Sequence, residues 1–273
     1  MTSSRRGSAR VLLAALLVAA SGMAAAAASV QLEDLTWTEL RERIQGGATT
    51  ALLPIGGTEQ NGPHMALGKH NVRVRWLAAR IALQLGDAIV APVLAYVPEG
   101  NIAPPSEHMR WPGTLSIPVP AFEAVLSAAA RSLRAHGFCH VVFLGDHGGY
   151  RASLERVATA LNHERTSRPN CRVHALPEYY RASATDFDAA LRARGFAADE
   201  IGLHAGLADT ALMLAVDPAK VRMDVAQARP RGKGGDGVAG DPRRATAELG
   251  RLGIEHIVEV SVLAIRERRL ASK

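Results

Sequence analysis

The sequence has few aromatic residues, a small excess of charge and no long apolar run beyond its N-terminus. Aromatics make up 4% of the 273 residues, which argues against a nucleic-acid surface built on stacked rings. The formal net charge is +6, but Arg5, Arg6 and Arg10 lie in an N-terminal segment without acidic residues, so 6 − 3 = +3 remains. That surplus is too small to require an anionic polymer as a partner.

The first 28 residues have the pattern of a cleavable signal peptide. A basic head is followed by an apolar run from Val11 to Ala20 and by small residues that end near Ala28. The apolar run is too short to cross ~30 Å of hydrocarbon. We therefore expect a periplasmic or secreted protein without membrane contact after cleavage, in which residues 29–273 form one domain. An uncleaved membrane anchor is the alternative.

Cysteine is also rare, since the chain contains only Cys139 and Cys171. Each begins an apolar run that is typical of a strand. If those strands are parallel neighbours, both thiols lie at one edge of the sheet, and a disulfide worth roughly 3–4 kcal/mol is conceivable in an oxidising compartment. The pattern nevertheless favours two unpaired buried thiols, and the spacing is not that of a CxxC motif.

Apolar runs alternate with helical patterns along the rest of the chain. Strands that are apolar on both faces and alternate with helices indicate an α/β protein, with a mostly parallel sheet covered on both sides. The predicted strands are residues 50–55, 88–96, 138–144 and 172–176. The predicted helices are residues 35–44, 72–85, 120–136, 152–165, 186–194 and 208–215, and residues 242–269 form one long helix or a helix plus a strand.

Histidine and acidic side chains gather in three segments, two of which directly follow predicted strands. Sites in parallel sheets form in the loops at the carboxyl ends of the strands. One carboxylate and two imidazoles are the protein ligands of a common catalytic zinc site, whose fourth position is left for water. The three groups are Glu59, His64 and His70; Asp146 and His147; and His204 and Asp209.

In these segments the sequence resembles the creatininase (creatinine amidohydrolase) family. The family loop E-Q-H-G-P-H-L-P-L-x-x-D is matched by residues 59–70, and the turn N-G-H-G-G-N by residues 145–150. The family segments that contain F-P-G-T, H-A-G-x-x-E-T-S and G-x-x-G-D-P-x-x-A-T are matched by residues 106–114, 204–211 and 237–246. This resemblance implies a three-layer α/β/α sandwich, a metal-dependent hydrolase of C–N bonds in cyclic or linear amides, and a homo-oligomer.

The resemblance also implies a metal centre. Typical family members hold two metals, and the positions of the first are Glu59, His70 and His147 here. The second metal would use Asn61, His70 and Gly149, so two of its ligands are lost. A carboxylate can bridge two cations, whereas a neutral imidazole offers one lone pair. We therefore expect one divalent metal per chain at the first set, with Zn²⁺ favoured and Mn²⁺ or Fe²⁺ as alternatives.

In this hypothesis a metal-activated water attacks the carbonyl of a small amide substrate. His204 matches the family histidine near the scissile bond and is the expected proton donor to the leaving nitrogen. Asp209 either orients His204 or completes the metal shell. Asp146 either fixes the imidazole of His147 or is a solvated loop acid. Lys69 is expected to face solvent, because an inward ammonium would disfavour a metal.

Other residues in the same segments are candidates for pocket or supporting positions. His64 could equally hold a structural hydrogen bond, and Trp111 could wall the pocket, although packing is the more common role of a tryptophan. The further candidates are Asn61, Glu107 and His108. Three functional alternatives remain: a relative acting on a formamide or a peptide-like amide, a decayed pseudoenzyme, and a non-catalytic periplasmic protein that binds a metal or a small molecule.

Overall fold

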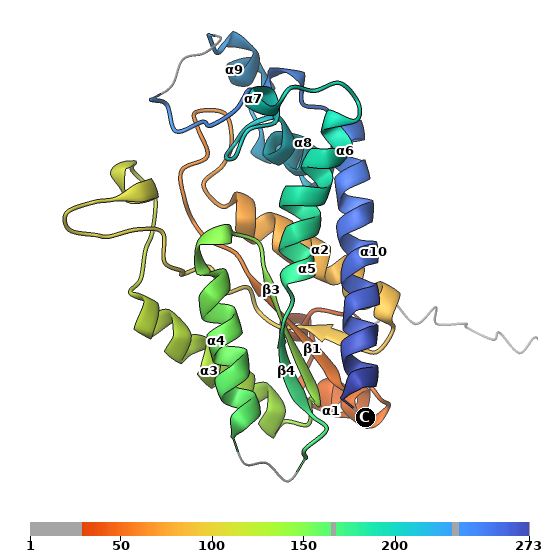
Figure 1. Cartoon of the computed structure of the whole chain (residues 1–273). Coiled ribbons are helices and arrows are strands. Elements are labelled where there is room, and N and C mark those ends of the chain that lie inside the picture. The colour runs from red at the N-terminus through yellow and green to blue at the C-terminus, as the bar shows by residue number, and fades with distance from the viewer. Residues whose placement is uncertain (1–28, 165–167, 231–234, 273) are drawn as a thin grey trace, which may run out of the picture.

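The computed structural model describes residues 29–164, 168–230 and 235–272, so the predicted signal peptide lies outside the described residues. Four strands form one parallel sheet in the order β2-β1-β3-β4 (Figure 1). The strands are β1 (Thr50–Ile55), β2 (Ala88–Val90), β3 (His140–Gly145) and β4 (Arg172–Ala175). Ile55 pairs with Gly145, so the carboxyl ends of β1 and β3 lie level and the loops that follow them leave the same edge.

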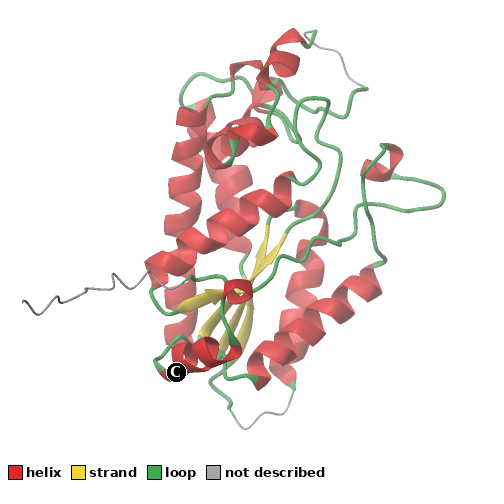
Figure 2. Cartoon of the chain, turned by 180° about the vertical axis from the view of Figure 1, so that it is seen from behind, coloured by secondary structure: helices red, strands yellow, loops and turns green. Residues whose placement is uncertain are grey.

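Helices cover both faces of the sheet, which confirms the three-layer α/β/α architecture (Figures 1 and 2). Leu52 of β1 and Val142 of β3 point into one core, whereas Leu53 and Phe143 point into the other. The first core is covered by α2 (Lys69–Leu85), α5 (Pro177–Arg181), α6 (Phe187–Arg192), α8 (Leu207–Val216) and α10 (Ala247–Ala271). The second is covered by α1 (Trp37–Gln45), α3 (Val119–Ala135) and α4 (Arg151–His163).

The helix boundaries follow local sequence signals. Thr36 caps α1 in a capping box with Glu39, and Thr246 caps α10. Gly86 ends α2 in the left-handed conformation, at φ 82°. The remaining short elements are α7 (Ala198–Ile201), α9 (Met223–Ala228), a π-helical turn at Ala182–Asp186, and 3-10 turns at Leu32–Asp34, Glu107–Arg110, Gly148–Tyr150, Pro218–Lys220 and Pro242–Arg244.

The structure differs from the sequence prediction at several elements, including residues 177–186, where α5 and the π-helical turn precede the predicted helix. The second strand ends at Val90 instead of continuing to residue 96, because Pro92 has no N–H to donate to a ladder. The helix α2 begins at Lys69, earlier than the predicted start at residue 72. For the last segment the structure confirms the first of the two alternatives, one long helix, α10, which begins at Ala247. No described helix combines the length and the apolar character that crossing a bilayer requires.

Cys139 and Cys171 form a disulfide, so the expectation of unpaired thiols is wrong. The pairing follows from the register of the sheet, in which His140 of β3 lies opposite Arg172 of β4. The residues that directly precede this pair are the two cysteines, and their Cα atoms are 4.4 Å apart. The sequence indicated the strands but not their register, and the register decides whether the thiols meet.

Replacing both cysteines with serine is expected to lower the free energy of unfolding by about 3–4 kcal/mol, because the disulfide closes a loop between residues 32 positions apart. Urea denaturation of the oxidised wild type and of the Cys139→Ser/Cys171→Ser variant measures the difference. Wild type in a reducing buffer should show the same loss. A loss below about 1 kcal/mol would contradict the prediction.

Candidate metal centre and active site

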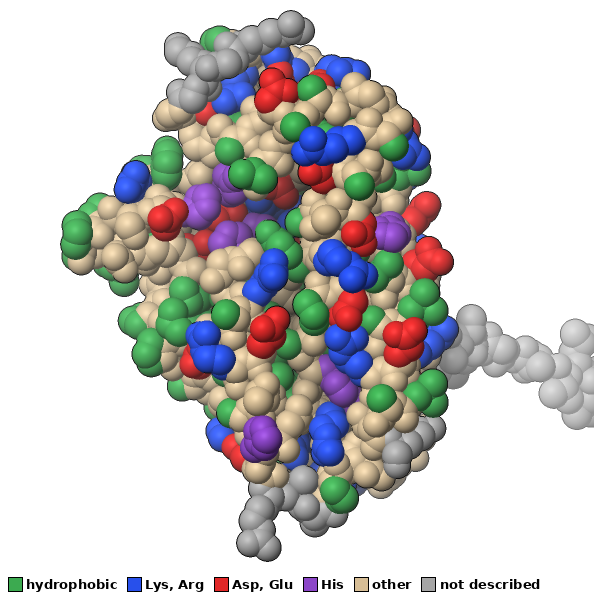
Figure 3. All heavy atoms as spheres, viewed as in Figure 1, with side chains coloured by type: hydrophobic (Ala, Val, Ile, Leu, Met, Phe, Trp, Pro, Cys, Tyr) green, Lys and Arg blue, Asp and Glu red, His purple; other side chains and the backbone are tan. Residues whose placement is uncertain are grey.

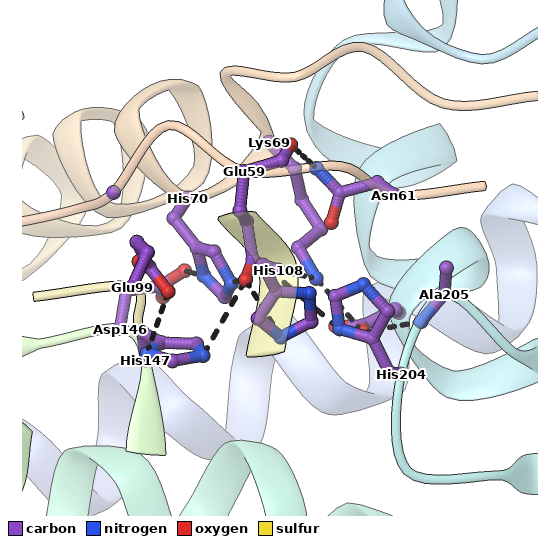
Figure 4. Close-up of polar contacts among 12 residues, drawn as sticks. Glu59, Asn61, Lys69, His70, Glu99, His108, Asp146, His147, His204 and Ala205 are labelled. Carbon is purple, nitrogen blue, oxygen red and sulfur yellow. Dashed lines mark hydrogen bonds and ion pairs between the residues drawn. The ribbon is translucent and has the colours of Figure 1, made fainter. Parts of the chain in front are cut away.

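Glu59 lies at the centre of a group of polar side chains at the carboxyl end of the sheet (Figure 4). Its Oε1 is 2.9 Å from His70 Nε2 and 3.5 Å from Lys69 Nζ. Its Oε2 is 3.2 Å from His108 Nε2 and 3.5 Å from His147 Nε2. Burial by itself raises the pKa of Glu59, but the charges of Lys69 and His70 outweigh burial and lower it below the usual range.

The loop after β1 is folded tightly enough to aim Glu59 inward. Asn61 donates from its amide to the carbonyls of Glu59, at 2.9 Å, and of Ala66, at 3.1 Å. Asn61 therefore holds the loop that carries Glu59 in its conformation, which is a supporting role near the site. A second carboxylate, that of Glu99, packs against the backbone of the same loop at Gly57. At this residue φ is 152°, and a Cβ would lie 2.5 Å from Glu99 Oε1, so only glycine leaves room for the Glu99 side chain.

Glu99 is a site residue that the sequence analysis missed. Its side chain is buried, and among the described residues neither of its carboxylate oxygens has a hydrogen-bond partner. Burial, followed by the negative charge of Glu59, raises the pKa of Glu99 to about 9. The signal that could have found it is the one used for Glu59: an acidic residue after an apolar strand, here between Pro98 and Gly100.

Four side chains form a donor group that fits a divalent cation. Glu59, Glu99, His108 and His147 each place one ligand atom within 4.8 Å of the others. Within the described part of the chain, Glu59 Oε2 and both oxygens of Glu99 are buried without a hydrogen-bond partner. Buried carboxylate oxygens are unfavourable unless a proton or a cation compensates them. Carboxylates and imidazoles together suit Zn²⁺, Mn²⁺ or Fe²⁺.

The three predicted ligands, Glu59, His70 and His147, converge, but His70 lies outside the four-residue donor group. The rings of His70 and His147 have centroids 5.2 Å apart. His70 Nδ1 lies 2.6 Å from Asp146 Oδ2, so its other nitrogen faces Glu59. His147 Nδ1 accepts the N–H of Gly149 instead. The assignment of metal ligands therefore stays a prediction, with Glu99 and His108 added to it.

Asp146 is fully enclosed rather than a solvated loop acid. It contacts His70 and not His147, the partner expected from the sequence. Its carboxylate also accepts hydrogen bonds from Arg73 Nε, at 2.9 Å, and from the hydroxyl of Tyr179, at 2.7 Å. Burial by itself raises the pKa of Asp146, but Arg73 and His70 lower it below its usual value.

His204 is held so that one nitrogen can accept a proton. Its Nε2 lies 2.8 Å from the carbonyl oxygen of Gln60, and a carbonyl accepts, so Nε2 carries the hydrogen. Burial, with a contribution from Lys69, lowers the pKa of His204 to about 4. The neutral ring therefore presents a lone pair at Nδ1, which lies 3.7 Å from Glu59 Oε1.

Asp209 lies outside the four-residue donor group and reaches His204 through the backbone instead of through the ring. Its carboxylate accepts hydrogen bonds from Lys69 Nζ at 3.0 Å, Arg73 Nη1 at 2.8 Å and the backbone N–H of Ala205 at 2.9 Å. The last bond fixes the backbone directly after His204, at a residue with φ 52°. Asp209 thus supports His204 by holding the backbone N–H of the next residue, Ala205, and not by a hydrogen bond to the imidazole ring.

Lys69 is 1% exposed, so the expectation that it faces solvent is wrong. The carboxylates of Glu59 and Asp209 compensate its burial, and that compensation is invisible in the sequence. Lys69 lines a cavity of about 250 Å³ together with His70, His108, His147, His204 and Asp209. Figure 3 shows histidine and acidic side chains gathered in a hollow on this face.

Three other candidates lie away from this cavity. His64 is buried, and its Nε2 is 3.0 Å from Thr210 Oγ1, which is the structural hydrogen bond offered as an alternative. Glu107 is exposed and Trp111 is half-buried, and both lie on the arm formed by residues 98–118. None of the three lines the described cavity. The same arm, which projects from the body in Figures 1 and 2, carries His108 into the site.

Known proteins match this chain over most of its length. The family model for creatininase (creatinine amidohydrolase) matches residues 33–265. The mycofactocin precursor peptide peptidase of Mycolicibacterium smegmatis is 28% identical over 234 residues, which are 78% of this chain and 83% of the relative. The creatinine amidohydrolase of Pseudomonas putida is 27% identical over 257 residues, 88% of this chain and 97% of that protein.

Solved structures agree with the sequence matches. A structure described as creatininase with Mn has a TM-score of 0.68 at 26% identity, covering 88% of this chain and 98% of its own. A creatinine amidohydrolase structure has a TM-score of 0.70 at 24% identity with the same coverage, a likeness of fold. The chain therefore belongs to the creatininase (creatinine amidohydrolase) family, whose members are hydrolases that act on amide bonds.

Proposed function

We propose that this protein is a metal-dependent amidohydrolase that cleaves a C–N bond in a small substrate. The observation that carries the proposal is that Glu59 Oε2 and both carboxylate oxygens of Glu99 are buried without hydrogen-bond partners among the described residues. They lie beside the ring nitrogens of His108 and His147, which line the cavity. Burying these carboxylate oxygens without partners costs free energy, whereas the same oxygens and ring nitrogens are favourable ligands for a divalent cation.

The residues that would hold the cation are Glu59, Glu99, His108 and His147, with His70 on the other oxygen of Glu59. A divalent cation held there would lower the pKa of a water and polarise a carbonyl. One solved relative is described as Mn creatininase and another as a Zn-Zn type, so we propose Zn²⁺ or Mn²⁺.

The protein's own groups supply the proton transfers. His204 presents the lone pair of Nδ1 at the cavity, where it can accept a proton from the attacking water and then donate it to the leaving nitrogen. Its bond to the carbonyl of Gln60 holds the ring in the required tautomer. The cavity of about 250 Å³ favours a small amide or the end of a short peptide.

Metal analysis combined with a substrate screen tests this function. We expect about one tightly held metal per chain and hydrolysis that stops on chelation and returns with Zn²⁺ or Mn²⁺. The screen should include cyclic amides, linear amides, formamides and short peptides, since one relative is a peptide peptidase. A metal-loaded protein that binds such compounds unchanged over hours would instead support a non-catalytic binding protein.

The donor group makes a prediction of its own. Glu99→Gln replaces a carboxyl group that can ionise around a cation with an amide of the same size, and we expect the dissociation constant for Zn²⁺ to rise at least about 100-fold. His70→Gln should raise it about 10-fold, because His70 then acts by positioning Glu59. Calorimetric titration measures both, and Glu107→Gln on the exposed arm is the matched control. A larger effect of His70→Gln than of Glu99→Gln would favour the ligand set predicted from the sequence.

We also propose that the protein is exported. The disulfide between Cys139 and Cys171 supports this, because such bonds persist in oxidising compartments. Fractionation of cells and N-terminal sequencing of the purified protein test the proposal. A protein that stays in the cytoplasm with Met1 intact would contradict it.

A further inference from the structure

Lys69 occupies an unusual place for a lysine. It is the first residue of α2, it is 1% exposed, and it lies in the wall of the cavity. Its ammonium is 3.0 Å from Asp209 Oδ2 and 3.5 Å from Glu59 Oε1. Glu59 thus has a fixed cation on its Oε1 side, whereas its Oε2 faces the donor group formed with Glu99, His108 and His147.

Fixed cations already occupy part of this acidic site. The connected groups comprise four acidic side chains and two fixed cations. A second metal cation beside Glu59 would share a buried carboxylate with the ammonium of Lys69, which is unfavourable for two positive charges. The carboxylates are Glu59, Glu99, Asp146 and Asp209, and the cations are Lys69 and Arg73.

The two cations have different freedom to act on a substrate. Arg73 is committed to Asp146 and Asp209, which accept from its Nε and Nη1. Lys69 has three N–H bonds, and among the described residues its contacts with Asp209 and Glu59 account for two of them. Since Lys69 also lines the cavity, the third N–H is available to a ligand there.

We propose that Lys69 supplies the second positive charge of the active centre and donates a hydrogen bond to the oxygen of the scissile carbonyl. This inference rests on the proposed amidohydrolase function. A fixed donor aimed at an oxygen that gains charge in the transition state raises kcat more than it lowers KM. The same ammonium opposes a second cation beside Glu59 and so adds to the loss of ligands at Asn61 and Gly149 in favouring one metal per chain.

The test compares Lys69→Met and Lys69→Arg with wild type, and Lys220→Met on the exposed surface is the control for the same substitution. Calorimetric titration with Mn²⁺ gives affinity and stoichiometry without any substrate. We expect Lys69→Met to bind Mn²⁺ at least about 10-fold more tightly or to gain a second, weaker binding event, because a repelling charge is removed. Lys69→Arg, which keeps the charge, and Lys220→Met should titrate like wild type.

Kinetics on a substrate from the screen give the second readout. Lys69→Met should lower kcat by about 10²–10³-fold with KM changed less than threefold, and Lys69→Arg should recover part of kcat. Unchanged Mn²⁺ binding together with an unchanged kcat in a folded Lys69→Met variant would overturn the inference. If wild type hydrolyses no amide, the proposed function fails. The Mn²⁺ titration by itself then decides whether the ammonium of Lys69 limits metal binding at the site.

Discussion

Replacing His147 with alanine is expected to abolish turnover and most metal binding. His147 belongs to the donor group and lies 3.5 Å from Glu59 Oε2. A metal contributes several kcal/mol of transition-state stabilisation, so its loss corresponds to at least about a 10³-fold fall in kcat/KM. The side chain is 18% exposed and is bonded locally to Gly149, so the variant should fold.

Metal content by elemental analysis and kcat/KM at added Zn²⁺ measure the effect. His163→Ala, at the exposed end of α4, is the matched control and should behave as wild type in both assays. Retention of one metal per chain with unchanged affinity in His147→Ala would show that the cation is held elsewhere.

Replacing Asp146 with alanine is expected to cost about 3–5 kcal/mol of the free energy of unfolding, the typical result of breaking a buried ion pair from one side. The change leaves Arg73 Nε and the hydroxyl of Tyr179 buried without their acceptor. It also frees His70 Nδ1, so metal affinity should fall by about 10–100-fold. Urea denaturation and metal titration measure the two losses.

Glu123→Ala is the control for this second variant, because Glu123 of α3 pairs with Arg156 of α4 on the surface and such pairs are worth about 1 kcal/mol or less. The effect of Asp146→Ala should depend on pH. The folded pKa of Asp146 is lowered, so its contribution is complete above the ordinary aspartate pKa and is lost as pH falls through the folded value. A difference between variant and wild type that grows on acidification would contradict this assignment.

The local pattern of the sequence predicted most of the sheet and both loops that carry Glu59 and His147. These predictions succeed because a strand that is apolar on both faces, and a turn that needs glycine, each depend on residues that are adjacent in the sequence. The prediction failed at the second strand, where the chain leaves the ladder after Val90 yet still brings Glu99 to the site. For Asp146 it offered either a contact with His147 or a solvated position, whereas the structure pairs Asp146 with His70 from α2.

The alternation of apolar runs with helical patterns determined the α/β class, and the order of the motifs determined the family, since each depends on residue type and spacing along the chain. The ligand set of Glu59, His70 and His147, implied by the family resemblance, stays a prediction. Only the tertiary structure decided that the cysteines pair, that Lys69 is buried, and that Glu99 and His108 join Glu59. The physical reason is that strand register, and the compensation of one buried charge by another, depend on residues that are distant in sequence and become neighbours only in the fold.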